Sequence, residues 1–305
     1  MSHRRKHFLV LLIFLLVSRT NCQKKSKMSK NCRRCGISPA NKPSTGTSRK
    51  IINGIEIKQK NKYPWLVYIN KEGELSCGGA IISDRFILTA AHCFLKGKAF
   101  KEQVCLQKKS TPKPCYLPTK EIKVGVLRHN GSYELFQVAR IIPHPSFSIN
   151  GRMGDIGLIK LKKSILCGTM SSPICLPYKN LNKYNKSLMV AGWGRYSEKN
   201  YERKLREGRM TQVHRKECLA GEDDPRTARR YLCAVGIRTD QKTCYGDSGS
   251  AIFAKFGQKY HALGITSFGF SQPNVLCSLD KPATFTKVYH YMKWIKKYVK
   301  NIPKP

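Results

Sequence analysis

Short apolar runs separated by polar turns make up most of the chain from Ile51 onward. They are broken by Gly, Pro, Asn and Lys, and they include Trp65–Asn70, Ala80–Ile82, Phe86–Thr89, Phe136–Ile142, Ile156–Leu161, Leu188–Gly192, Ala251–Phe256 and Ala262–Phe268. Many short strands of this kind predict an all-β barrel or sandwich. The segment 51–305 has the length of one two-lobed domain, and we find no internal repeat in it.

The apolar period changes near the C-terminus. Val288, Tyr291, Met292 and Ile295 recur at helical spacing, with lysines on the opposite face. This pattern predicts an amphipathic helix over Tyr289–Asn301. We expect it to pack on the β-domain rather than to bind a membrane.

An unbroken apolar run of ten residues, Phe8–Val17, follows the basic start Arg4, Arg5 and Lys6. The run is too short to span a bilayer and is typical of the core of a signal peptide. A membrane anchor is the less favoured alternative, since the flanking chain is polar and basic. We therefore expect a signal peptide at residues 1–22 and a secreted, extracellular protein.

Residues 23–50 have no hydrophobic periodicity, and this polar, basic segment predicts a flexible pro-segment. The first 50 residues contain 13 Lys and Arg and no acid, and the whole chain carries a net charge of +39. Such a charge favours anionic partners, among them sulfated glycans and other polyanions. Solubility, or packing with a polyanion during storage, is the alternative. No motif indicates specific nucleic-acid binding.

Thirteen cysteines indicate an oxidising compartment, and removal of Cys22 with the signal peptide leaves an even number. The sequons at Asn130 and Asn185 are candidate glycosylation sites. Cys32-Arg33-Arg34-Cys35 has the spacing of a redox or zinc motif. It lies in a basic tail without a second ligand pair, so we do not favour that interpretation.

Three segments in fixed order carry candidate chemistry: Thr89-Ala90-Ala91-His92-Cys93, Asp155 at the head of an apolar run, and Gly246-Asp247-Ser248-Gly249. A serine hydroxyl is a poor nucleophile at neutral pH. It needs an imidazole to accept its proton and a carboxylate to orient that imidazole. The sequence supplies all three in the order His, Asp, Ser.

These segments resemble the trypsin/chymotrypsin family of serine proteases. The resemblance extends from Ile51 to about Asn301 and also rests on Ile51–Gly54, Cys77–Gly79, Pro173–Pro177 and Gly192–Gly194. It implies two six-stranded antiparallel β-barrels with the active site between them.

The resemblance also implies individual roles. Ser248 is expected to be the nucleophile, His92 the general base and then acid, and Asp155 the group that orients His92. The backbone N–H groups of Gly246 and Ser248 are expected to form the oxyanion hole.

Activation is expected by cleavage at Lys50–Ile51, performed by a trypsin-like protease, because Arg49-Lys50 precedes the apolar Ile51-Ile52. In the family the new ammonium group pairs with the acid beside the nucleophile, here Asp247.

The family's disulfides, where positions match, imply the pairs Cys77–Cys93, Cys218–Cys233 and Cys244–Cys277. Further expected pairs are Cys105–Cys115 in a basic insertion, Cys35–Cys175 as a tether of the pro-segment, and Cys32–Cys167 as a second tether.

We do not expect the primary specificity of trypsins. Lys242 stands where trypsins have an acid, six residues before the nucleophile, and Gly269 and Ala283 are expected on the opposite wall of the pocket. Lys242 either faces the pocket and selects acidic residues, or turns away and leaves an apolar pocket for aromatic or leucine side chains. Ser250 replaces a common glycine, and we expect the turn to persist because serine is small.

The leading hypothesis is a secreted serine endopeptidase made as a zymogen, monomeric and acting on protein or peptide substrates. We expect no cofactor and no metal, because the region from Lys96 to Lys123 is basic rather than acidic. The alternatives are a catalytically weak protease-like protein that binds polyanionic glycans or membranes, and a non-cleaving cofactor of a proteolytic cascade.

Overall fold

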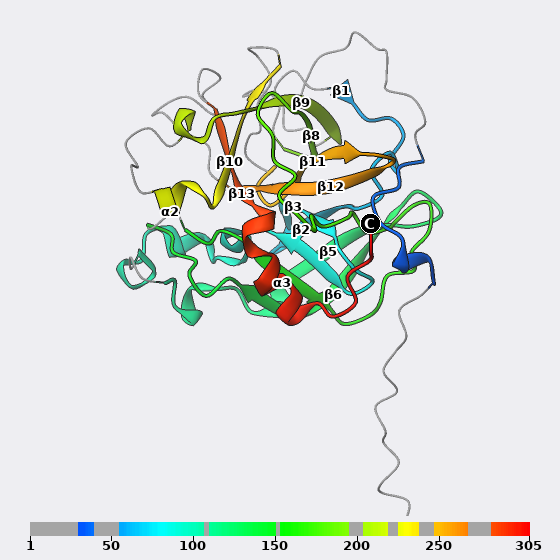
Figure 1. Cartoon of the computed structure of the whole chain (residues 1–305). Helices are drawn as coiled ribbons and strands as arrows, with labels where there is room; N and C mark the ends of the chain where they lie inside the picture. Colours follow the sequence, from blue (N-terminus) through cyan, green and yellow to red (C-terminus); the bar gives the residue numbers. More distant parts are fainter. Residues whose placement is uncertain are drawn as a thin grey trace, which may run out of the picture.

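The computed structural model describes residues 30–39, 55–106, 110–150, 153–194, 204–218, 225–237, 247–267 and 282–305 (Figure 1). The predicted signal peptide, residues 1–22, lies outside the described residues. Of the predicted pro-segment, residues 23–50, the structure describes residues 30–39.

The first half of the chain forms a closed antiparallel barrel with the strand order β2-β3-β4-β7-β6-β5. Its strands are β2 (Leu66–Lys71), β3 (Glu74–Ile81), β4 (Phe86–Thr89), β5 (Ile122–Leu127), β6 (Tyr133–Pro143) and β7 (Gly157–Leu161). Apolar side chains such as Ile69, Ile87 and Leu158 are fully buried and fill its interior. Burial of this kind is the main favourable term in folding.

The second half forms another antiparallel barrel, in the order β9-β10-β13-β12-β11-β8, which closes through pairing of β8 with β9. Its strands are β8 (Ser187–Gly192), β9 (Arg206–Val213), β10 (Tyr231–Gly236), β11 (Ala251–Phe256), β12 (Lys259–Thr266) and β13 (Ala283–Lys287). The short β1 (Ile55–Glu56) pairs with the start of β9. The prediction of two six-stranded antiparallel barrels is confirmed.

An aromatic cluster joins the two barrels. Trp65, ahead of β2, is fully buried and meets Phe253 of β11 edge to face, with ring centroids 5.2 Å apart. Tyr63 contacts both rings, at 5.5 Å from Trp65 and 4.9 Å from Phe253. Such pairs stabilise by about 0.5–1.5 kcal/mol beyond burial alone. They help to hold the barrels in one arrangement.

The C-terminal helix is present but shorter than predicted. A 3-10 turn over Val288–Tyr291 leads into α3 (Met292–Tyr298), and the next residue, Val299, has an extended backbone conformation. Val299 is buried and the chain continues along the pro-segment, where the carbonyl oxygen of Lys304 lies 3.5 Å from Sγ of Cys35. Within the described part of the chain, no helix is long and apolar enough to cross a membrane.

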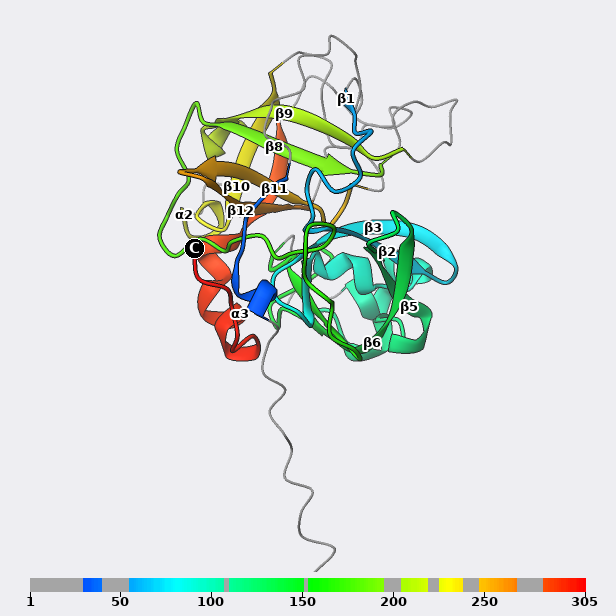
Figure 2. The ribbon, with the colours of Figure 1, turned by 90° about the vertical axis from the view of Figure 1, so that its right-hand side faces the viewer.

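The described part of the pro-segment is held against the second barrel and the C-terminal segment (Figure 2, blue and red). Disulfides join Cys32 to Cys167 and Cys35 to Cys175. Gly36, directly after Cys35, has a φ of +68°. Its N–H donates to the Pro173 carbonyl oxygen, and its own carbonyl oxygen accepts a hydrogen bond from the Tyr260 N–H. A Cβ atom on Gly36 would overlap the backbone of Tyr260, so this close approach requires glycine.

Candidate active site

His92 lies on a 3-10 turn, Ala91–Phe94, that directly follows β4. Ala90 and Ala91 are fully buried, which lets the turn lie close to the barrel. A disulfide joins Cys93 to Cys77 of β3, with sulfur atoms 2.03 Å apart. The turn is therefore fixed on both sides, while the His92 side chain stays 18 % exposed.

Asp155 precedes β7 and is fully buried. Its Oδ2 lies 2.8 Å from Nδ1 of His92, and its Oδ1 accepts a hydrogen bond of 2.9 Å from the His92 backbone N–H. The hydroxyl of Ser267 donates to the same Oδ2 at 2.6 Å, and Thr286 donates to the Asp155 carbonyl oxygen at 2.9 Å. This network fixes both the carboxylate and the imidazole that it contacts.

The electrostatics of this pair favour an ionised carboxylate. Burial alone would raise the pKa of Asp155. The charge of His92 and the hydrogen bonds from His92 and Ser267 outweigh burial, so its pKa lies below the ordinary value. A carboxylate that stays ionised holds the Nδ1–H tautomer of His92, and this leaves Nε2 able to accept a proton.

Ser248 lies on a turn that both barrels hold. Its carbonyl oxygen accepts a hydrogen bond of 2.8 Å from the N–H of Gly78 in β3, and the N–H of Gly249 donates to Thr266 of β12 at 2.8 Å. Gly249 has a φ of +81°, and a Cβ atom there would overlap the hydroxyl of Thr89. The turn therefore needs glycine at position 249.

Gly78 connects the serine turn to the histidine turn. It hydrogen-bonds Ser248 and is adjacent to Cys77, the disulfide partner of Cys93, which follows His92. One short covalent and hydrogen-bonded path thus joins the two candidate catalytic turns across the barrel junction. The structure brings His92, Asp155 and the Ser248 turn to one place.

Asp247, beside the candidate nucleophile, is 1 % exposed. Its Oδ1 accepts a hydrogen bond of 3.0 Å from the N–H of Gly194. Cβ atoms at Gly192 or Gly194 would come within 2.5 Å of the carboxyl group, so the Asp247 side chain fits here only because both residues are glycine. A buried carboxylate requires such partners.

Ser250 is fully buried in the same turn, where its N–H donates to the Asp247 carbonyl oxygen at 3.0 Å. Its hydroxyl has no hydrogen-bond partner among the described residues. The turn therefore accommodates serine.

Several predicted site residues lie outside the described residues. They are Lys50 and Ile51 at the activation site, Gly246 of the oxyanion hole, Lys242 and Gly269 of the specificity pocket, and the pair Cys244 and Cys277. Ala283 is described: it is buried at the start of β13, opposite Ala234 of β10.

The remaining cysteines and sequons can be placed. Disulfides join Cys105 to Cys115 in the basic insertion and Cys218 to Cys233 at the edge of the second barrel. Asn130 and Asn185 are exposed.

One group of described residues has three potential metal-ligand atoms close together: Cys77, His92 and Cys93. Both sulfurs of that group are in a disulfide, and Nδ1 of His92 contacts Asp155. These residues therefore do not suit a metal ion.

Sequence reasoning did not find Ser267 and Thr286 as partners of Asp155, nor Gly78 as partner of Ser248. Ser267 directly follows β12 and Thr286 lies in β13, both more than 100 residues from Asp155. Neither has a local motif, so no signal in this single sequence marks them.

The comparisons with known proteins agree with this geometry. A sequence model described as Trypsin matches residues 51–295. The chain belongs to the trypsin family. A relative is the phenoloxidase-activating enzyme of Bombyx mori, which is 32 % identical over 77 % of this chain and 57 % of its own length.

Two further relatives of this member of the trypsin family are less similar. The CLIP domain-containing serine protease B14 of Anopheles gambiae is 28 % identical over 84 % of this chain and 75 % of its own length. Coagulation factor XI of Bos taurus is 27 % identical over 83 % of this chain and 38 % of its own length. The chain thus spans just over half of the silkworm enzyme and a smaller share of factor XI.

Proposed function

We propose that the protein is a secreted serine endopeptidase, made as a zymogen, that hydrolyses peptide bonds with His92, Asp155 and Ser248. The observation that carries this proposal is the 2.8 Å contact between His92 Nδ1 and the fully buried Asp155 carboxylate, beside the anchored Ser248 turn. The family match and the relatives named as proteases support it.

The geometry suits acyl transfer in two stages. Nε2 of His92 takes the proton from Ser248 Oγ as that oxygen attacks the scissile carbonyl carbon, and His92 then protonates the leaving amine. Asp155 stabilises the imidazolium formed between these steps, and Ser267 holds the carboxylate in place. Water then hydrolyses the acyl-enzyme by the same route in reverse, with His92 again as the base.

Activation would follow cleavage between Lys50 and Ile51 by a trypsin-like protease. The new Ile51 ammonium group would pair with Asp247, whose carboxylate already contacts the Gly194 N–H. A buried ion pair that loses one partner is destabilised by about 3–5 kcal/mol, so the cleavage would be coupled to ordering of the substrate pocket.

The substrate is proposed to be a protein. The relative from Bombyx mori is named for activating phenoloxidase, and we extend to this chain only the idea of a protease that acts on another protein. Two specificities remain open: cleavage after acidic residues if Lys242 faces the pocket, and cleavage after aromatic or leucine residues if it turns away.

The test uses protein cleaved after Lys50, with Ile51 confirmed as the N-terminus by mass spectrometry, and Ser248→Ala protein processed in the same way. Both are profiled on a peptide library varied at the residue before the scissile bond. We expect turnover by the native protein only, with a fluorophosphonate adduct on Ser248. Absence of turnover and adduct with a correct N-terminus would instead favour the catalytically weak, polyanion-binding alternative. Cleavage after Arg or Lys would refute the prediction that Lys242 excludes trypsin-like specificity.

A further inference from the structure

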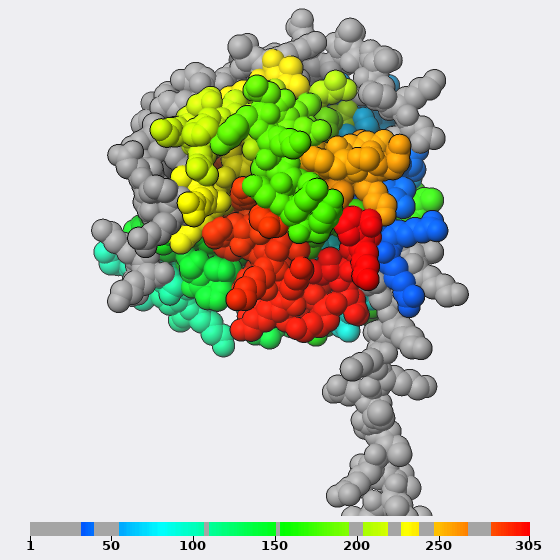
Figure 3. Space-filling view, viewed as in Figure 1, coloured from blue at the N-terminus to red at the C-terminus, as the bar shows by residue number. Residues whose placement is uncertain are grey.

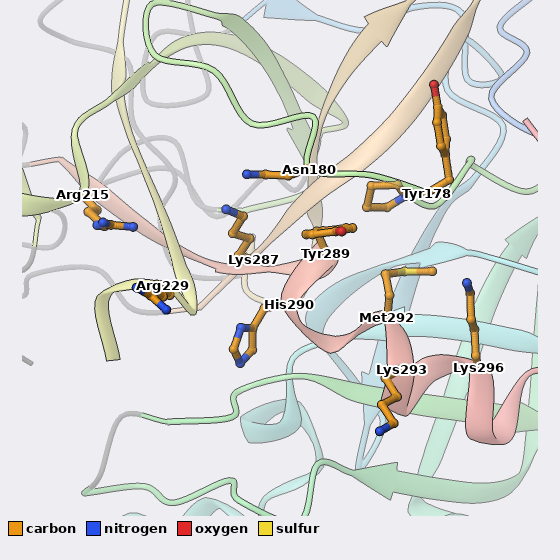
Figure 4. Close-up of a pocket in the computed structure, with 11 residues that line it drawn as sticks. Tyr178, Asn180, Arg215, Arg229, Lys287, Tyr289, His290, Met292, Lys293 and Lys296 are labelled. Atoms are coloured by element: carbon orange, nitrogen blue, oxygen red, sulfur yellow. The ribbon is translucent and has the colours of Figure 1, made fainter. Parts of the chain in front are cut away.

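A basic hollow lies beside the C-terminal segment, which Figure 3 shows in red, and Figure 4 shows the residues that line it. Its volume of about 750 Å³ falls within the range of ligand-binding pockets, roughly 300–1,000 Å³. Its cationic lining comprises Arg215, Arg229, Lys287, Lys293 and Lys296. No Asp or Glu is among the residues that line it.

The five cations come from separate parts of the chain. Arg215 begins the 3-10 turn Arg215–Glu217, Arg229 follows α2 (Pro225–Ala228), and Lys287 ends β13. Lys293 and Lys296 belong to α3. A run of lysines on one helix face is commonly only a solvated surface. Here tertiary folding gathers cations from four elements around one concavity.

The positive charge of this hollow is not neutralised within the described part of the chain, where the ion pairs involve other residues. Partial burial, and then the charge of Arg215, lower the pKa of Lys287. Like charges placed together in a concave surface destabilise the protein unless an anion binds between them.

A second hollow of about 560 Å³ adjoins the first, and both are lined by His290 and Lys293. It adds Arg230 and Lys297 as cations and again has no acid among its lining residues. We call the two hollows together the basic track. Because it extends over two adjoining hollows, it fits a chain with repeated negative charges better than a single small anion.

Two exposed tyrosines border the first hollow. Tyr178 is 62 % exposed and Tyr289 is 39 % exposed; Figure 4 shows Tyr289 beside Lys287 and Tyr178 at the margin of the hollow. An exposed aromatic ring offers an apolar face and a polar tip. Such rings can pack on the C–H faces of sugar rings while neighbouring cations bind the charged substituents.

We propose that the basic track binds a sulfated polysaccharide. Its concave shape suits a polymer chain rather than the flat surface of a bilayer. Five disulfides within the described residues indicate an oxidising, extracellular setting, where sulfated polysaccharides are abundant anionic polymers. Arg guanidinium groups bind sulfate by charge-assisted, often bidentate hydrogen bonds. Binding would retain the protein at glycan-rich surfaces, and it does not depend on the proposed peptidase activity.

The test measures binding of a heparin octasaccharide to the full chain by calorimetry at about 0.15 M salt. The track variant is Arg229→Ser/Lys293→Ser/Lys296→Ser, which removes three exposed cations and leaves Lys287, the neighbour of Thr286, in place. The matched control is Lys120→Ser/Lys162→Ser/Lys255→Ser, which removes the same charge from exposed positions outside the track. All binding measurements are repeated with Ser248→Ala added to each protein. Glycan binding is then measured independently of whether the protein is a peptidase.

One exposed ion pair changes a binding constant by up to about fivefold. We therefore expect the track variant to bind at least about tenfold more weakly, and the control to stay within about threefold of the native protein. Desulfated heparin should bind weakly to all three proteins. Equal losses of heparin affinity in both triple variants would overturn the proposal, because they would show that heparin responds to the overall positive charge of the protein and not to the basic track. If anionic vesicles or DNA bind more tightly than heparin, and lose affinity in the track variant, the choice of ligand is wrong. If the native protein does not bind heparin, the basic track is not a binding site for sulfated polysaccharides.

Discussion

Gly249 packs directly against Thr89, so that the turn carrying Ser248 and the strand leading to His92 are in van der Waals contact. A Cβ atom on Gly249 would overlap the Thr89 hydroxyl, which itself donates a hydrogen bond of 2.8 Å to the Gly78 carbonyl oxygen. The positive φ of Gly249 adds a second reason for glycine. The relative position of the two candidate catalytic turns therefore depends on the absence of one side chain.

Gly249→Ala is expected to lower the free energy of unfolding by about 3 kcal/mol or more, since it combines overpacking with an unfavourable φ, and to abolish peptide turnover. Gly257→Ala is the matched control. Gly257 also has a positive φ, but nothing lies within 4 Å of a Cβ atom there. Gly257→Ala should cost only about 1–2 kcal/mol, the usual cost of a left-handed conformation for an L-residue, with turnover retained. Equal costs in urea unfolding would show that overlap with Thr89 is unimportant.

Asp155→Asn is expected to reduce kcat by roughly 10⁴-fold, because an amide no longer fixes the His92 tautomer. Ser267→Ala removes one of the donors to the carboxylate and should reduce kcat much less, with KM little changed. Steady-state kinetics on processed protein provide the measurement. A loss from Ser267→Ala as large as that from Asp155→Asn would mean that Ser267 does more than position the carboxylate.

Ser250→Ala is expected to stabilise the protein by about 1 kcal/mol. The Ser250 hydroxyl is buried without a hydrogen-bond partner among the described residues, and desolvation of such a group costs about 1–3 kcal/mol. Urea unfolding at pH 7 measures the effect. A clear loss of stability would indicate that the hydroxyl has a partner after all.

The pro-segment should stay attached after cleavage at Lys50–Ile51, because two disulfides hold it. Removing one pair, as Cys32→Ser/Cys167→Ser or Cys35→Ser/Cys175→Ser, should leave the fragment bound. Removing both pairs should release it without reductant, as seen by intact mass and by non-reducing electrophoresis. Release from either two-residue variant would show that the remaining disulfide does not form.

Stability should fall in mild acid because of His144. Burial, His290 and Arg230 lower the pKa of His144 from 6.5 to about 4, and its Nδ1 accepts a hydrogen bond from the Ser146 N–H. The unfolded state therefore binds more protons than the folded state between about pH 6.5 and pH 4. The free energy of unfolding should decrease as the pH is lowered through this window.

His144→Phe keeps the ring contacts with Tyr291 and Trp294 but removes the titration. Lys293 and Lys297 line the same hollow as His144. Between pH 7 and pH 5, native protein should lose on the order of 1 kcal/mol more stability than the variant. If the difference in free energy of unfolding between native protein and His144→Phe is the same at pH 7 and pH 5, titration of His144 does not control stability in this range.

Much of this protein is determined by local sequence patterns. The alternation of short apolar runs with turns predicted an all-β fold. A strand that buries one or both faces needs apolar residues at regular positions, and these are visible in the sequence. The observed β4 and β11 match the predicted runs Phe86–Thr89 and Ala251–Phe256. The helical period near the C-terminus predicted α3 but not its end. The apolar period continues to Val299, which is buried in an extended conformation after the helix has ended.

Tertiary structure alone decided which groups support the candidate chemistry. Ser267 and Thr286 meet Asp155, and Gly78 meets Ser248, only after strands from distant parts of the chain have paired and both barrels have closed. The basic track arises in the same way, from cations that are unremarkable one at a time. A residue pattern records which side chains are buried or exposed along one element. It carries no distance between elements, and the chemistry of this protein depends on those distances.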